Sequence, residues 1–172
     1  FGLNTSDTRF ALKDSTLMAF NLFWPNAPKK TYNYTFREYG VYKCYDYEDV
    51  DIFMMDNRMF KTALNQYDPQ FFGDNQMNRF INEIMGSNAA FKFIICGNSI
   101  LTEGKDDEPF QDYSKEYEEF MRRLHLSRIN GVVFITGDTD KTELLKEERK
   151  YGYVKTGIGY AQNLWKRMLV SA

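Results

Sequence analysis

The feature that most constrains this fold is a succession of short, mostly apolar runs separated by longer amphipathic stretches. The runs cover residues 50–55 (V-D-I-F-M-M), 91–95 (F-K-F-I-I) and 132–135 (V-V-F-I). Runs of this length and composition predict buried strands. Because helical stretches separate them, the sequence predicts an α/β layered fold in which a sheet is covered by helices.

Three stretches carry apolar residues at helical spacing. The first helix is expected to begin near Asp14 or Ser15, either of which could cap it, and to end at Pro25. The second follows a loop at 65–74 and ends at Gly86. The expected apolar faces are Leu17, Phe20, Phe23 and Trp24 in the first helix, Met77, Phe80, Ile81, Ile84 and Met85 in the second, and Tyr117, Phe120, Met121 and Leu124 in the third.

The remaining stretches are less regular. Alternation at 32–36 predicts a strand, and residues 41–45 are expected to return from a turn at 39–40. The Lys/Glu-rich stretch up to Lys150 is a candidate helix, and the glycine-containing tail has no assigned structure. No linker or internal repeat divides the chain, so residues 1–172 are expected to form one domain segment.

Composition limits the function classes. A chain of 172 residues with 43% hydrophobic residues can bury a core, and disorder is not expected. A net charge of -2 argues against a general nucleic-acid binder. No apolar run approaches the length of a membrane span. The chain opens on Phe1 with no initiator Met or basic leader, and a secreted origin stays open because a signal would already be gone.

Cysteine and histidine are scarce. Cys44 and Cys96 match no zinc or redox spacing, and a disulfide and two buried free thiols are both open. His125 is the single histidine, so a scheme that needs several imidazoles cannot be completed by this chain. Its position beside the apolar face of the third helix indicates packing or surface.

The sharpest polar feature is V-V-F-I-T-G-D-T-D, in which two carboxylates follow an apolar run. Sites of α/β proteins lie at the carboxyl ends of strands. Asp138 and Asp140 could therefore both face a hard cation through oxygen. Gly and Asp are also common turn residues, and on this motif alone an ordinary turn is favoured over a metal site.

A second polar cluster, Asp56-Asn57-Arg58, follows the run at 50–55. Arg58 is suited to bidentate binding of a phosphate, and Asp56 could hold that arginine or reach a metal. A structural salt bridge explains the pair at least as well. A third candidate is Asn4, in F-G-L-N-T-S-D-T-R-F, for which a solvated loop is the favoured interpretation.

The order of these motifs resembles the alkaline phosphatase D-like phosphodiesterases of the calcineurin-like metallophosphoesterase superfamily. D-V-D-I-F-M-M-D-N-R is similar to the family strand ending in Leu-Asp-x-Arg, and F-G-D-N-Q-M-N-R-F-I-N-E-I to its Leu-Gly-x-x-Gln helix. S-N-A-A-F-K-F-I-I-C-G-N resembles its Ser-x-Ala-x-Trp-Lys strand, and G-V-V-F-I-T-G-D-T-D-K-T-E-L resembles Ser-Gly-Asp-x-His-x-Thr-Glu-Leu. The opening F-G-L-N-T-S-D-T-R-F, the L-F-W-P-N stretch and D-Y-S-K-E-Y-E-E-F-M-R-R-L also find counterparts, in the same order.

The resemblance implies a metallophosphoesterase-type layered sandwich and hydrolysis of phosphomonoesters or diesters with bound calcium, iron, manganese or zinc. It makes Asp138 and Asp140 candidate metal ligands and Asn4 a ligand or a catalytic, phosphate-facing group. It makes Arg58 the catalytic phosphate contact, with Asp56 supporting it in substrate binding. Members are usually exported, which implies a secreted, periplasmic or membrane-anchored exterior location.

Two departures qualify these implications. Asp140 stands where the family has His, and a carboxylate cannot replace imidazole towards softer metals or a leaving group. The family's Asp-Asp-His-Asp motif would lie before Phe1, so the chain resembles the C-terminal half of a catalytic domain. We expect a missing segment, a partner chain or an oligomer to complete it. The chain is then either part of a phosphoester hydrolase, or a degenerate member or fragment that serves as a structural or interaction module.

Overall fold

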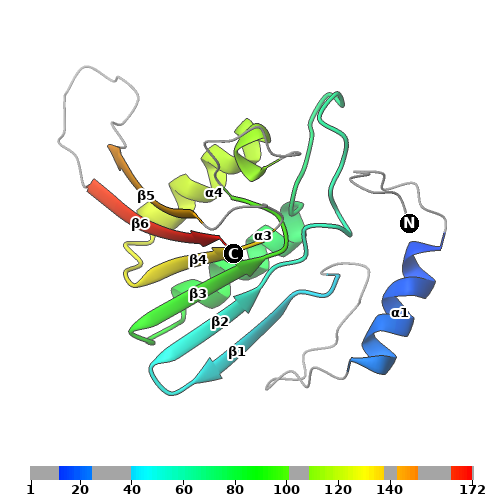
Figure 1. Ribbon diagram of the computed structural model, residues 1–172, viewed down its shortest axis with the longest axis horizontal. Coiled ribbons are helices and arrows are strands. Elements are labelled where there is room, and N and C mark those ends of the chain that lie inside the picture. Colours follow the sequence, from blue (N-terminus) through cyan, green and yellow to red (C-terminus); the bar gives the residue numbers. More distant parts are fainter. Residues whose placement is uncertain (1–11, 25–39, 101–108, 138–142, 151–163, 172) are drawn as a thin grey trace.

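The computed structural model describes residues 12–24, 40–100, 109–137, 143–150 and 164–171 (Figure 1). The strands are β1 (Lys43–Tyr47), β2 (Val50–Met54), β3 (Phe91–Cys96), β4 (Val132–Thr136), β5 (Glu143–Lys150) and β6 (Leu164–Ser171). The helices are α1 (Lys13–Phe23), α3 (Asp74–Met85) and α4 (Ser114–Leu126), with a 3-10 turn at Phe110–Asp112.

The six strands form one mixed sheet in the order β1-β2-β3-β4-β6-β5. β2, β3, β4 and β6 are parallel, whereas β1 and β5 pair antiparallel at the two edges. The predicted α/β fold, with a sheet covered by helices, is confirmed. All the described strands belong to this sheet, so the second sheet of the expected sandwich is not among them.

Helices α3 and α4 cover the same face of the sheet (Figure 1). Each connects a parallel strand to the next one along the sheet, and right-handed crossovers in one direction place both helices on one side. Phe53 of β2 meets Phe80 of α3 with ring centroids 5.4 Å apart. Phe134 of β4 meets Phe120 of α4 at 6.2 Å. The hydrophobic core therefore lies between these helices and the sheet.

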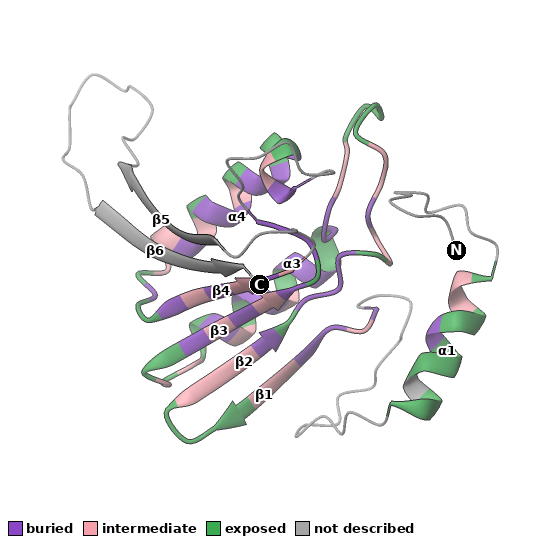
Figure 2. Cartoon of the chain, in the orientation of Figure 1, coloured by how far each residue is buried: buried purple, intermediate pink, exposed green. Residues whose placement is uncertain are grey.

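The opposite face of the sheet is also apolar, because consecutive strand residues point to opposite sides. Two rows cross β2, β3 and β4 there, and their members are Ile52, Phe93 and Val133, and Met54, Ile95 and Ile135. Figure 2 shows buried and partly exposed residues alternating along β3 and β4. Met54 is 39% exposed. Parallel sheets usually have both faces covered.

A buried carboxylate joins the two helices at their amino ends. Glu116 of α4 is 8% exposed and accepts hydrogen bonds from the backbone N–H groups of Phe71, Phe72 (3.0 Å) and Gly73 (2.8 Å). These donors immediately precede α3, where a helix leaves N–H groups without intrahelical partners and favours negative charge. Burial raises the pKa of Glu116, and the three N–H donors oppose that rise.

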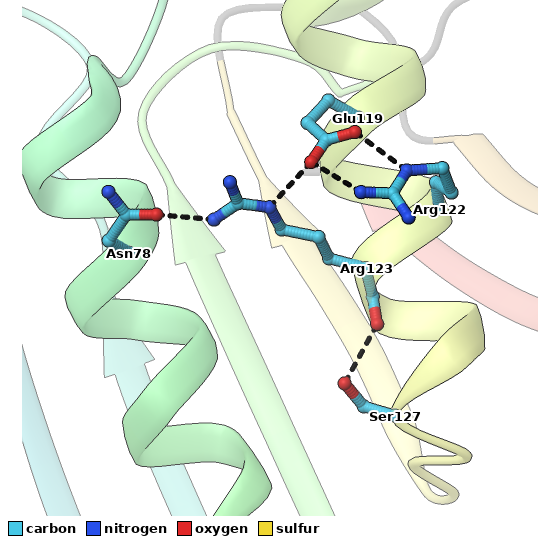
Figure 3. A network of polar contacts seen from close by, with 5 residues as sticks. All are labelled: Asn78, Glu119, Arg122, Arg123 and Ser127. Carbon is cyan, nitrogen blue, oxygen red and sulfur yellow. Dashed lines mark hydrogen bonds and ion pairs between the residues drawn. The ribbon is translucent and has the colours of Figure 1, made fainter.

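A second, exposed network links the same helices further along (Figure 3). Glu119 contacts Arg122 and Arg123 of its own helix, each at 2.7 Å, and Arg123 donates to Asn78 of α3. The hydrogen bond from Arg122 is the main cause that lowers the pKa of Glu119 to about 2. The Ser127 hydroxyl donates to the Arg123 carbonyl at 2.8 Å. Because the charges are exposed, the network orients the helices more than it stabilises them.

Helix α1 forms where it is predicted, but its apolar face does not enter the core. Leu17 is buried, whereas Phe23 and Trp24 are 76% and 64% exposed. The helix begins at Lys13 without a side-chain cap, so the expected cap at Asp14 or Ser15 is wrong. Among the described residues, no helix is long and apolar enough to cross a membrane.

Two other expectations are settled by strand pairing. The Lys/Glu-rich stretch expected to be helical is strand β5, which pairs with β6 from Glu143↔Ser171 to Lys150↔Leu164. Pairing with a distant strand overrides the helix propensity of Lys and Glu.

Cys44 and Cys96 are free thiols. They lie on strands separated by β2, about 10 Å apart at standard strand spacing, which is too far for a disulfide.

We expect Glu116→Gln to lower the free energy of unfolding by about 1–3 kcal/mol, because its amide nitrogen would face a buried N–H donor. Urea unfolding measures this. Glu48→Gln makes the same chemical change in the exposed turn between β1 and β2 and is the matched control. Equal unfolding free energies for the two variants would contradict a structural role for Glu116.

Candidate functional site

The candidate site lies at the carboxyl edge of the parallel strands. Sheet pairing of β2 ends when Met55 N–H donates to Ile95 C=O at 2.8 Å. The chain beyond that point is polar but buried, which requires hydrogen-bond partners from elsewhere. The buried polar residues at this edge are Asp56, Asn57, Asn98, Ser99 and Thr136.

Asp56 organises the loop that carries Arg58. Its Oδ1 accepts hydrogen bonds from Arg58 N–H (2.8 Å) and Met59 N–H (2.9 Å), and its Oδ2 accepts one from Val41 N–H (2.8 Å). Aspartate stabilises turns in this way, by bonding backbone groups two or three residues ahead. Of the roles open to Asp56, the structure supports holding Arg58 in place. It does so through the arginine backbone.

Gln76 of α3 satisfies the backbone of Asp56 itself. Asp56 N–H donates to Gln76 Oε1 at 2.7 Å, and Gln76 Nε2 donates to Asp56 C=O at 2.7 Å. The second Nε2 hydrogen goes to Phe72 C=O at 2.9 Å. Gln76 is completely buried. Its amide therefore supplies the hydrogen bonds that a neighbouring strand would otherwise supply at the point where β2 leaves the sheet.

Gly40 allows the chain to pass close to Asp56. Its φ is +58°, in the left-handed region, and a Cβ atom there would lie 2.0 Å from Asp56 Oδ2. A side chain at position 40 would therefore displace the carboxylate or the backbone. The glycine brings Val41 N–H within reach of that oxygen.

Polar contacts connect the loops after β2, β3 and β4. Asn57 Nδ2 donates to Asn98 Oδ1, and a Cβ atom at Gly97 would lie 3.1 Å from Asn57 Oδ1. Ser99 Oγ donates to Gly137 C=O at 3.4 Å. The ends of three parallel strands are thus tied together along one edge.

Arg58 differs from its buried neighbours because it is exposed. Its guanidinium makes no hydrogen bond or ion pair with residues 40–100 or 109–137 that would occupy it. A structural salt bridge between Asp56 and Arg58 is therefore not formed, and that alternative from the sequence is wrong. A guanidinium that no described residue occupies, on a fixed backbone, can bind an oxyanion through two N–H groups.

The three predicted metal ligands, Asn4, Asp138 and Asp140, lie outside the described residues. Within the described part, no three His, Cys, Asp or Glu side chains are placed to hold a metal ion. Asp56 directs both carboxylate oxygens to backbone donors. The metal-ligand assignments remain predictions.

Sequence reasoning missed Gln76 and Asn98 as parts of this edge. Gln76 appeared only as the glutamine of F-G-D-N-Q, in the segment that resembles the Leu-Gly-x-x-Gln helix, and was given no role in a site. Asn98 follows an apolar run, as Asp56 does, and that shared pattern could have identified it. His125 lies in the last turn of α4, which leads to the opposite, amino edge of the sheet. This position agrees with the predicted packing or surface role.

Comparison with known proteins agrees with this architecture. No family model matches the sequence, and no curated protein matches it. The described fold is similar to part of a solved structure, which confirms the resemblance at the level of fold alone. One matching solved structure is "Structure of PhoD", with a TM-score of 0.59 and 14% identity. The match covers 76% of this chain and 28% of that one.

We expect Gly40→Ala to lower the free energy of unfolding by about 2 kcal/mol or more, because a left-handed φ and a clash with Asp56 act together. Thermal or urea unfolding measures the change. Gly86→Ala is the control, since a Cβ atom there meets its nearest neighbours at 3.6 Å. A harmless Gly40→Ala would show that the approach of Gly40 to Asp56 is not needed.

Proposed function

We propose that this chain is part of a metal-dependent phosphoester hydrolase of the alkaline phosphatase D type. The observation that carries the proposal is the exposed Arg58 on a loop fixed by Asp56 at the carboxyl edge, in a PhoD-like fold. Ligands of α/β sheets bind at this edge. An arginine there can neutralise and orient a phosphoryl group.

The proposal assigns Arg58 to the phosphate and Asp56 to the support of Arg58. Asn4, Asp138 and Asp140 would hold one or more metal ions through oxygen, a donor set that favours hard cations. When bound, such ions polarise phosphoryl oxygens and provide a hydroxide at neutral pH. Calcium, manganese, iron and zinc are the candidates. Export from the cytoplasm belongs to the same proposal.

Completion by further chain is also part of the proposal. The chain spans 28% of the PhoD chain that it matches. The apolar rows on the second face of the sheet and the exposed Phe23 and Trp24 of α1 support a covering segment, partner chain or oligomer. That covering part would also supply the remaining metal ligands.

The alternative is a non-enzymatic module that keeps the fold. Asp140 in place of the family histidine favours it, because a carboxylate does not replace an imidazole in leaving-group chemistry. Such a module would still need Asp56, Gln76 and Glu116 for folding. It would not need a free guanidinium at position 58.

Turnover of an aryl phosphate monoester and diester tests the hydrolase proposal directly. We expect hydrolysis to depend on added calcium, manganese, iron or zinc, and Asp138→Asn to lower metal affinity or turnover at least about tenfold. No turnover with any of the four metals in the full-length protein would favour the module. Turnover unaffected by Asp138→Asn would remove Asp138 from the ligand set.

Arg58→Ala is expected to weaken inorganic phosphate binding by about 10- to 100-fold, because hydrogen bonds to a charged group are worth roughly 1.5–3 kcal/mol. Stability should change by less than about 0.5 kcal/mol, since the side chain is exposed. Calorimetric titration with calcium or manganese present measures the affinity. Arg128→Ala removes an exposed arginine between α4 and β4, at the opposite edge, and is the control. Unchanged phosphate affinity in Arg58→Ala would leave the arginine without its proposed role.

A further inference from the structure

We infer that Gln76 is a positioning residue that sets phosphate affinity through Arg58, although its side chain bonds neither Arg58 nor any exposed group. The inference rests on the proposed function, because it assigns Arg58 to the phosphate. It adds a residue on a different element, 20 positions further along the chain from Asp56. Three steps connect the two side chains.

The first step is the loss of sheet pairing at the end of β2. Met55 N–H still bonds β3, but the peptide groups of Asp56 lie beyond the ladder and are buried. Gln76 satisfies both the N–H and the C=O of Asp56, each at 2.7 Å. One side chain thus fixes the two peptide planes on either side of the Asp56 Cα atom.

The second step runs from that Cα atom to the backbone of Arg58. Once the peptide planes are fixed, the Asp56 carboxylate is aimed at the N–H groups of Arg58 (2.8 Å) and Met59 (2.9 Å). Val41 N–H holds the other oxygen and prevents the carboxylate from turning away. The position from which the Arg58 side chain leaves the loop therefore follows from the Gln76 contacts.

The third step is the benefit to anion binding. An arginine loses side-chain conformational freedom when it binds, and a mobile loop beneath it would add backbone entropy to that cost. When the loop is already fixed, the anion does not have to offset this loss of backbone entropy on binding. Gln76 itself is anchored by its bond to Phe72 C=O, beside the N–H groups that Glu116 holds. The position of the loop that carries Arg58 therefore depends on both α3 and α4.

A double-mutant cycle tests the inference in the full-length protein, with inorganic phosphate as the probe and calcium or manganese present. We expect Gln76→Met, which keeps the length of the side chain and removes its amide, to weaken phosphate binding at least about threefold. In the Arg58→Ala background, the same change should have no further effect on phosphate affinity. Gln76→Glu, which keeps an acceptor for Asp56 N–H, provides a second variant if Gln76→Met does not fold.

The cycle distinguishes positioning from general stability. Ile84→Val removes a buried methyl group from the same helix, and it should lower thermal stability without changing phosphate affinity. Equal affinity in parent and Gln76 variants, or an equal loss with and without Arg58, would overturn the inference and leave Gln76 structural. A parent protein that binds no phosphate would instead overturn the proposed function, and the inference with it.

Discussion

The handedness of two crossover connections determines most of what is described in this chain. Because β2, β3 and β4 follow one another across the sheet in a single direction, α3 and α4 must pack on the same face. The aromatic core forms there, between Phe53, Phe80, Phe120 and Phe134. Neither of these two helices packs on the opposite face of the sheet (Figure 1). The parallel direction of β2, β3 and β4 gathers their carboxyl ends at one edge, where the polar groups accumulate.

The chain beyond β2 and the residues that open α3 place peptide groups outside any sheet or helix ladder, and buried side chains bond them. Gln76 bonds the backbone beyond β2, Asp56 bonds the turn that follows, and Glu116 bonds the residues that open α3. These three residues come from three motifs that are separate in the sequence but depend on one another in the fold. Removing one partner would leave the others with buried donors or acceptors, which is costlier than the loss of one hydrogen bond.

The sequence was sufficient for the elements whose formation is governed by local apolar periodicity. β2, β3, β4, α3 and α4 all lie where the pattern places them, to within a few residues. It failed at β5, whose Lys/Glu-rich stretch becomes a strand only by pairing with β6. Asp56 and Arg58 were singled out by their position after an apolar run. Gln76 and Glu116 were not, because their partners are backbone groups, which no residue pattern reveals. The metal ligands stay predictions.

Arg58 is the residue that best distinguishes the two interpretations of the chain, part of a phosphoester hydrolase or a non-enzymatic module. Asp56 and Asn57 are buried, and their side-chain hydrogen bonds give both a structural role in this chain. Arg58 follows directly and contributes only its backbone N–H to the described structure. An exposed arginine is ordinary in itself. Here it stands on a turn held by four hydrogen-bonded backbone groups, at the edge where α/β proteins bind ligands. A module that only needed to fold could carry almost any polar residue at this position, whereas a phosphoester site needs a fixed, unoccupied guanidinium.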